Sequence, residues 1–206
     1  MKKTILIISL LIFSNVAWAQ KAPEGFWGLK WGSGKEELKK LLDPIIARRP
    51  EILTDLSQLR LGLITEHFDD FYQSDSINFS AGVRKEWEKI GEGEVTHYFF
   101  YYHENKFYKA SVSFPKHLSF DIFLKALTMK YGNPQSVTPL VLKINPNAKV
   151  GMKYHWVLED KVGISLSYSD MENTAVNGTL DYIYIPIWRE INKVRDKDAV
   201  KTKDKL

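Results

Sequence analysis

The chain has 206 residues, of which 44% are hydrophobic and 13% aromatic, with 29 Lys and Arg against 25 Asp and Glu. This composition is too apolar for a disordered chain, and the apolar residues are too dispersed for a multi-span membrane protein. Cysteine is absent, which excludes a thiol nucleophile and a cysteine metal site and predicts a protein without a lipid anchor.

The first nineteen residues have the pattern of a secretory signal peptide. A cationic start at Lys2 and Lys3 precedes an apolar run over 4–13, and small residues at Ala17 and Ala19 suit a signal peptidase. The run is too short to span a bilayer. We therefore predict a signal peptide over 1–19 with cleavage between Ala19 and Gln20. The expected location is periplasmic or secreted, with no transmembrane segment after cleavage.

The positive charge is concentrated at the two ends of the chain. Loss of Lys2 and Lys3 with the leader lowers the formal net charge from +4 to +2, and residues 189–206 hold seven Lys and Arg against four Asp and Glu. The remaining body is nearly neutral, whereas a nucleic-acid-binding domain needs a basic face. We therefore predict no nucleic-acid partner, one domain over 20–188, and a charged flexible tail over 189–206.

A capped helix is predicted at the start of the domain. Ser33 with Glu36 three residues later forms a capping box, and the leucines over 38–42 share one helical face. Asp43-Pro44 is expected to end this helix. Trp27 and Trp31 precede it, and we expect both rings to pack in the core.

Residues 50–92 are harder to interpret. The apolar spacing over 51–63 is weakly helical, and residues 65–80 mix aromatic and acidic types without a period, which predicts a loop. Val83, Trp87 and Ile90 have helical spacing, so a short helix is expected before Gly91.

The pattern beyond residue 96 predicts hairpins and one more helix. Residues 96–103 and 107–114 alternate strongly around a turn at 104–106, which indicates a β-hairpin. Ser119 is expected to cap a helix that stops at Gly132, and a polar connection then runs to about Lys149. Three strands follow, over 154–158, 164–168 and 180–185. Pro186 ends the last one, and one or two helical turns over 187–194 precede the tail.

This order predicts an α+β fold, in which an antiparallel sheet of hairpins is packed by short helices. The order also suggests two copies of a helix-then-strands unit, over 26–114 and 119–187.

Three short motifs carry a resemblance to known families. They are Phe26-x-Gly28-Leu29-x-Trp31-Gly32, Tyr101-Tyr102-x-x-Asn105-Lys106-Phe107-Tyr108 and Lys130-Tyr131-Gly132-Asn133-Pro134. The combination is similar to families of uncharacterised exported bacterial proteins. It also loosely resembles small envelope modules, such as the outer-membrane assembly lipoprotein BamE and the β-lactamase inhibitor proteins. The resemblance implies a fold of helices packed on a sheet, and it assigns no functional residue.

No sequence motif points to catalysis, a metal or a cofactor. Gly32-Ser33-Gly34-Lys35 lacks the first glycine and the hydroxyl of a phosphate loop, and no G-x-S-x-G occurs. The five histidines form no metal-binding pair by spacing, which leaves His67 beside Asp69 and Asp70 as the weak alternative. We therefore predict no catalytic residues, no metal and no cofactor.

The aromatic strand is the better functional candidate. Its rings point to both sides of the sheet, and the stripe of His97, Phe99, Tyr101 and His103 suits a protein partner or a sugar if that side is exposed. We predict a non-enzymatic periplasmic binding module with a protein partner in the cell envelope. The alternatives are a small exported hydrolase with a dispersed active site, and a structural subunit of an envelope complex whose basic tail meets lipid or a partner.

Overall fold

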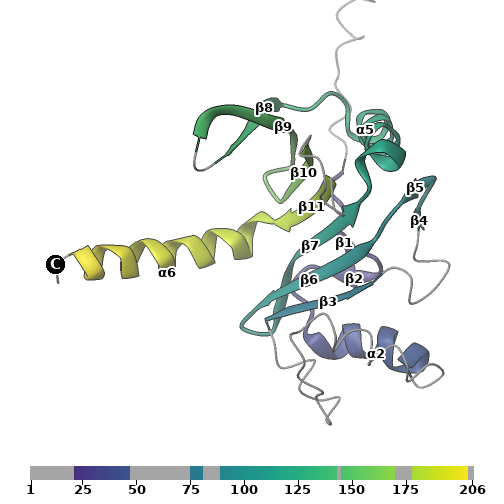
Figure 1. The fold of residues 1–206 in the computed structure, drawn as a ribbon. Helices are drawn as coiled ribbons and strands as arrows, with labels where there is room; N and C mark the ends of the chain where they lie inside the picture. Colours follow the sequence, from purple (N-terminus) through teal and green to yellow (C-terminus); the bar gives the residue numbers. More distant parts are fainter. Residues whose placement is uncertain (1–20, 47–74, 81–88, 143–144, 170–177, 204–206) are drawn as a thin grey trace, which may run out of the picture.

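A seven-stranded antiparallel sheet organises the molecule (Figure 1). The computed structural model describes residues 21–46, 75–80, 89–142, 145–169 and 178–203. Within these ranges three helices accompany the sheet, so the predicted α+β class is confirmed. The predicted signal peptide, the expected helix over 51–63 and the His67 alternative lie outside the described residues.

The elements follow one another along the chain in alternating groups of strands and helices. Their bounds are β1 Gly25–Phe26, β2 Leu29–Lys30, α2 Lys35–Ile46, β3 Ser76–Ser80, β4 Lys89–Ile90, β5 Gly93–Glu94, β6 His97–His103, β7 Lys106–Phe114, α5 Lys116–Tyr131, β8 Ser136–Leu142, β9 Asn145–Leu158, β10 Val162–Ser169, β11 Gly178–Tyr184 and α6 Ile185–Lys203.

The strand order of the sheet is β3-β6-β7-β11-β10-β9-β8. The sheet contains two sets of strands that pair in chain order, three from β3 to β7 and four from β8 to β11, and the last strands of the two sets, β7 and β11, pair with each other. A helix precedes each set in sequence, α2 before β3 and α5 before β8 and β9. This arrangement is what two copies of a helix-then-strands unit would produce, although the duplication itself stays a prediction.

Two predicted hairpins are confirmed, and each turns on two residues with positive φ. Glu104 and Asn105 have φ of 47° and 60° between β6 and β7, and Glu159 and Asp160 have 49° and 52° between β9 and β10. Two central residues with positive φ are typical of the type I′ turn, whose twist matches that of the flanking strands.

One side of the sheet holds the hydrophobic core, and we call it the apolar face. Across its middle, Phe100, Ala110, Tyr182, Ile164 and Trp156 are successive cross-strand partners from β6 to β9. All but Tyr182 have an exposed fraction of 0%. The helices α2 and α5 pack on this face through buried side chains, namely Leu38 and Leu42 of α2 and Phe120, Phe123 and Leu127 of α5.

The N-terminal tryptophans also belong to the apolar face. The Trp27 ring stacks on Tyr98 with centroids 5.3 Å apart, and the Trp31 ring stacks on Phe107 at 4.9 Å. The Trp31 Nε1–H donates a hydrogen bond of 2.8 Å to the carbonyl of Pro23. The expected core role of both rings is confirmed, because each packs against buried residues.

The predicted capping of α2 is wrong. The helix begins at Lys35, and the Lys35 N–H donates to the Asn105 side-chain oxygen at 3.0 Å. The Ser33 hydroxyl is buried and has no hydrogen-bond partner. The helix also continues past Asp43-Pro44 to Ile46, although Pro44 lacks the N–H that would bond to the carbonyl of Lys40. A distant turn, rather than the local sequence, therefore caps α2.

Ser119 does not cap α5. The helix begins three residues earlier, at Lys116 after Pro115, and Ser119 lies within its first turns with no exposed surface. The Ser119 hydroxyl donates to the carbonyl of Glu94 at 2.7 Å, which ties α5 to β5. The predicted stop at Gly132 is confirmed, since Gly132 has a φ of 75° and its N–H donates to Thr128.

Other segments differ from the expected structure. The edge strand β3 occupies the end of the predicted loop over 65–80, and β8 with the start of β9 occupies the predicted connection up to Lys149. Lys89–Ile90 is a strand, β4, where the end of a short helix was expected; residues 81–88 lie outside the described part. β3 pairs with β6, which begins seventeen residues later, whereas β4 and β8 pair with the strands that directly follow them. Cross-strand packing rather than a clear local pattern decides these strands.

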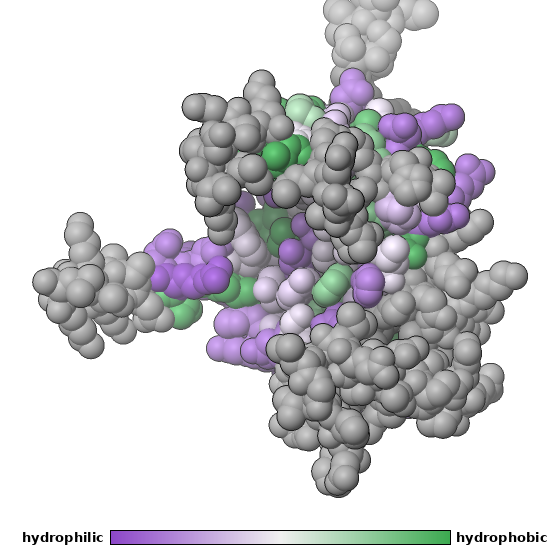
Figure 2. Space-filling model, viewed as in Figure 1, coloured by the Kyte–Doolittle hydropathy of each residue, from purple (hydrophilic) through white to green (hydrophobic). Residues whose placement is uncertain are grey.

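The last helix is longer than expected. α6 spans 19 residues instead of one or two turns, and it extends away from the sheet after β11 (Figure 1). In Figure 2, hydrophilic side chains lie along one edge of α6 and hydrophobic ones along the other. Trp188 and Val194 are 45% and 53% exposed. Among the described residues, no helix combines the length and the apolar character that crossing a membrane requires.

Candidate functional site

The predicted aromatic stripe lies on the side of the sheet opposite the core. Along β6, buried and half-buried residues alternate strictly, with Tyr98, Phe100 and Tyr102 on the apolar face. The alternate residues of β6 point to the opposite side and are all half-buried; they are His97, Phe99, Tyr101 and His103. The predicted alternation is therefore confirmed, whereas the role of the stripe in binding stays a prediction.

Strand register extends this stripe across five strands of the sheet. Phe99 is paired with Ser111, Ser111 with Asp181, Asp181 with Ser165, and Ser165 with His155. Because direct partners share a face, these five residues form one row from β6 to β9. We call this side of the sheet, with that row at its centre, the polar face.

A charged pair lies next to the aromatic stripe. The Lys109 ammonium lies 4.9 Å from the centroid of the Tyr101 ring and 3.4 Å from a carboxylate oxygen of Asp181. The Lys109 and Asp181 side chains are only 26% and 17% exposed, so their attraction is less screened than at an open surface. Tyr101 therefore lies against a partly buried ion pair, which the sequence did not indicate.

The stripe itself divides into two parts. The rings of His97 and Phe99 lie 6.3 Å apart on one stretch of β6. His103 is paired with Lys106 beside the β6–β7 turn, beyond the register shift that follows Tyr101. The structure therefore joins Tyr101 to Lys109 and Asp181 and leaves His103 at the edge of the site.

Small hydroxyl side chains fill the centre of the polar face. Ser111, Ser113 and Ser165 are 7%, 4% and 5% exposed. The hydroxyls of Ser167 and Thr179 bond to each other at 2.7 Å. The Ser165 hydroxyl, in contrast, has no hydrogen-bond partner, although buried polar groups are normally satisfied. A ligand that supplied an acceptor or a donor here would remove that cost.

Burial shifts the pKa values of His97, His155 and Tyr101 on this face. It lowers the pKa of His97 below 6.5, and it lowers the pKa of His155, an effect that Lys153 adds to and Asp181 opposes. Burial, helped by Asp181, raises the pKa of Tyr101. Both imidazoles are therefore neutral at pH 7, and each can donate and accept one hydrogen bond.

The row brings an acid, a serine and a histidine together, but not in the order of a catalytic triad. Ser165 on β10 lies between Asp181 on β11 and His155 on β9. A triad needs the histidine between the other two, whereas two strand spacings separate Asp181 and His155 by roughly 10 Å. Nor do the described residues include a group of three His, Asp or Glu that could hold a metal ion.

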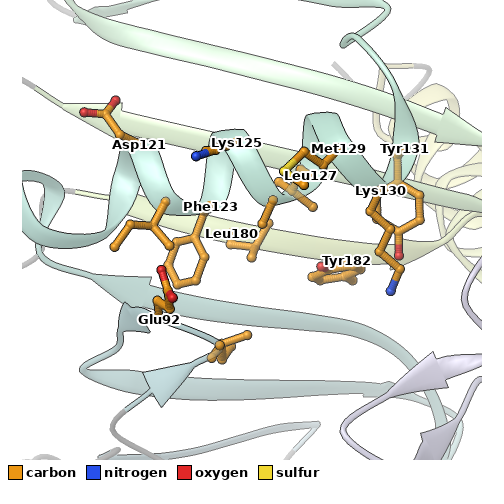
Figure 3. A pocket seen from close by; sticks show the side chains of 14 residues that line it. Glu92, Asp121, Phe123, Lys125, Leu127, Met129, Lys130, Tyr131, Leu180 and Tyr182 are labelled. Carbon is orange, nitrogen blue, oxygen red and sulfur yellow. The ribbon is translucent and has the colours of Figure 1, made fainter.

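A second candidate site lies on the other side of the sheet and was not predicted. A groove of about 660 Å³ separates α5 from the turn between β4 and β5 and reaches β11 (Figure 3). Its walls include Phe123, Leu127 and Tyr131 of α5 with Leu180 and Tyr182 of β11. The sequence showed these α5 residues only as a helical stripe, which is equally typical of core packing.

Comparisons with known proteins returned nothing for this chain: no protein-family model, no curated protein and no solved structure matches it. The class established by the structure is an α+β protein with a seven-stranded antiparallel sheet. The resemblance to BamE and to the β-lactamase inhibitor proteins stays a prediction, so function must be argued from the two sites themselves.

Proposed function

We propose that the protein is an exported, non-enzymatic binding module of the cell envelope that takes a protein partner on the polar face. One observation carries the proposal: aromatic, charged and hydroxyl side chains share the side of the sheet opposite the core and opposite α2 and α5. A sheet side with a purely structural role does not need a partly buried Lys109–Asp181 pair or an unpartnered Ser165 hydroxyl.

The size of the polar face suits a protein rather than a sugar. The six spacings between the seven strands give this face a width of roughly 29 Å. Along the strands, three rows of side chains cover a length of about 20 Å. An area of several hundred Å² is close to the ~800 Å² that each partner contributes to a standard protein interface. Neither the groove beside α5 nor a smaller cavity of about 330 Å³ between Lys21 and Tyr184 lies on this face.

The composition of the polar face also suits a protein partner. Phe99 and Tyr101 offer ring surface at low conformational cost, and tyrosine is enriched among the residues that dominate binding energy. Neutral His97 and His155 can exchange hydrogen bonds with backbone or side-chain groups of a partner. The Lys109–Asp181 pair would fix the register of the complex, because buried charges tolerate only a complementary neighbour.

Export rests on the signal-peptide pattern over 1–19, with cleavage before Gln20. The partner is therefore expected in the periplasm or the envelope. Fractionation of cells that express the full chain would test this step. A protein that stays in the cytoplasm with residues 1–19 attached would contradict it.

Site-specific photo-crosslinking tests the proposed partner site. A benzophenone amino acid placed at Phe99 of the mature chain should yield one discrete protein adduct in the native envelope. The matched control carries the same group at Leu41, which is 42% exposed on α2, away from the polar face. The protein identified from the adduct is then purified and titrated against the wild-type chain.

Support requires an adduct from Phe99, none of the same size from Leu41, and saturable binding of the purified partner. No discrete adduct from Phe99, or the same adduct from both positions, would contradict a binding site on the polar face. The hydrolase alternative draws no support from the Asp181–Ser165–His155 row, because its order does not match a triad.

One observation favours the second alternative function, a structural subunit of an envelope complex. α6 is 19 residues long, contains six Lys and Arg against three Asp and Glu, and exposes Trp188. If α6 forms the main contact, removal of residues 197–206 would release the protein from its complex, whereas substitution of Tyr101 would not. The opposite pattern supports the binding module.

A further inference from the structure

The groove beside α5 is a built cavity with an apolar floor. Phe123, Leu127 and Leu180 line it and are only 3%, 5% and 2% exposed, so the surrounding core holds each side chain in place. Its volume of about 660 Å³ falls in the range of small-molecule sites, which are mostly apolar with a few polar groups. The floor therefore suits an apolar body rather than a polar one.

Gly93 allows the floor to form. A Cβ at this position would lie 2.4 Å from the Phe123 ring, so any larger residue would require Phe123 to shift. The Ser119 hydroxyl donates to the carbonyl of the neighbouring Glu94 at 2.7 Å. Both contacts hold the Phe123 end of α5 close against β5.

Three polar groups gather at the opposite end. Figure 3 shows the Tyr131 hydroxyl, the Lys130 ammonium and the Tyr182 ring close together there. Lys130 Nζ lies 5.1 Å from the centroid of the Tyr131 ring. Burial, helped by Tyr131, raises the pKa of Tyr182, so its hydroxyl remains a donor at neutral pH. An ammonium and phenol donors together favour an anionic oxygen ligand.

The charges of the groove differ between its ends. Glu92, Asp121 and Lys125 lie toward the Phe123 end in Figure 3, and all three are exposed, so this end has a net charge of −1, which disfavours an anion. Lys130 lies at the tyrosine end. Because like charges repel and opposite charges attract, an anionic group has one preferred position in the groove.

We propose that this groove binds a single-chain amphiphile with a carboxylate head, of the fatty-acid class. The head lies at Lys130, Tyr131 and Tyr182, and the chain lies over Phe123, Leu127 and Leu180. Charge complementarity at the head and the apolar floor select this occupant over a cationic or fully polar one. The site is separate from the polar face, so it stands or falls independently of the proposed protein partner.

Calorimetric titration of the full mature chain tests the proposal. Laurate should bind saturably at one site, and at least about tenfold more tightly than dodecylammonium, because only the carboxylate is attracted to Lys130. Lys130→Met should weaken laurate binding about fivefold or more, and Tyr182→Phe about threefold. Lys125→Met is the matched control, since it removes the same charge from the same helix away from the tyrosine end; we expect less than a twofold effect.

A neutral apolar probe separates head recognition from folding. N-phenyl-1-naphthylamine should bind the wild type and Lys130→Met with equal affinity, because it needs only the apolar floor. The proposal is overturned by a folded protein that shows no saturable laurate binding, or that binds dodecylammonium equally well. It is also overturned if Lys125→Met weakens laurate binding as much as Lys130→Met, or if Lys130→Met abolishes binding of the naphthylamine.

Discussion

The two faces of the sheet are built from the same strands but have opposite chemistry. On β9, Trp156 of the apolar face is 0% exposed, and its neighbour Val157 on the opposite side is 45% exposed. On β11, Tyr182 meets Phe26 at 5.2 Å on one face, and Asp181 meets Lys109 at 3.4 Å on the other. The period of two in a β-strand allows one segment to serve both purposes.

The two faces also contribute unequally to the stability of the fold. The apolar face gathers the buried rings, α2, α5 and the N-terminal segment, so most burial energy arises there. The polar face contributes cross-strand hydrogen bonds and one charged pair, which add little net stability but present specific groups. Under the proposed function, substitutions of buried core residues on the apolar face should change folding, and substitutions on the polar face should change binding of the protein partner.

The largest effect is expected for Trp156→Ala. This change removes a fully buried ring and its hydrogen bond of 2.9 Å from Nε1 to the carbonyl of Gly132. We expect a loss of ~3–5 kcal/mol in the free energy of unfolding, measured by urea denaturation. Val157→Ala is the matched control on the opposite face, with a loss below about 0.5 kcal/mol. Equal losses for the two variants would contradict the division between the faces.

Tyr101→Ala is expected to change binding more than folding. Tyr101 is half-buried against Lys109, and its loss should weaken the partner identified by crosslinking by about tenfold or more, or ~1.4 kcal/mol. Its effect on unfolding should stay below about 1 kcal/mol. Leu41→Ala on α2 should leave the affinity unchanged. If Tyr101→Ala lowers stability strongly and leaves affinity intact, the polar face is structural.

Asn105→Ala tests the link between the β6–β7 turn and the start of α2. The change removes the acceptor for the Lys35 N–H and places alanine at a φ of 60°, so we expect a loss of ~1–2 kcal/mol. Asn105→Gly removes only the acceptor, because glycine tolerates the turn, and should cost less. Thermal unfolding of both variants separates the cap from the turn. An unchanged melting temperature for Asn105→Ala would show that neither matters.

The smallest effect concerns pH and tests the burial of the polar face. The pKa values of His97 and His155 are lowered in the folded protein, so the unfolded chain binds more protons below the ordinary value of 6.5. Stability should therefore fall as pH decreases from about 7 to 5, by roughly 1 kcal/mol or less per histidine. The His97→Gln, His155→Gln double variant should show a weaker decrease in urea denaturation. An identical pH profile would indicate that both imidazoles are solvated.

The sequence predicted the local features of the fold well. The alternation over 96–114 predicted the β6–β7 hairpin and the division of its side chains between two faces, and Gly132 predicted the end of α5. These features follow from side-chain period and backbone conformation, which neighbouring residues decide. The prediction failed where a distant partner decides: Ser33 and Ser119 have the chemistry of caps, but Asn105 caps α2 and Ser119 bonds to Glu94.

The candidate sites show the same limit. The sequence indicated the stripe of His97, Phe99, Tyr101 and His103 because one strand contains all four residues. It did not indicate that Lys109 and Asp181 join Tyr101, since they come from β7 and β11. The groove was missed for the same reason, because its lining combines α5 with β4, the turn after β4, and β11.

The sequence by itself therefore determined the α+β class, the hairpins and the parity of the aromatic strand, because these depend on residues adjacent in the chain. Only the tertiary structure decided which strands pair, which side of each strand meets the helices, and which polar residues form one row. Register causes the difference, since a shift of one residue moves every side chain of a strand to the other face.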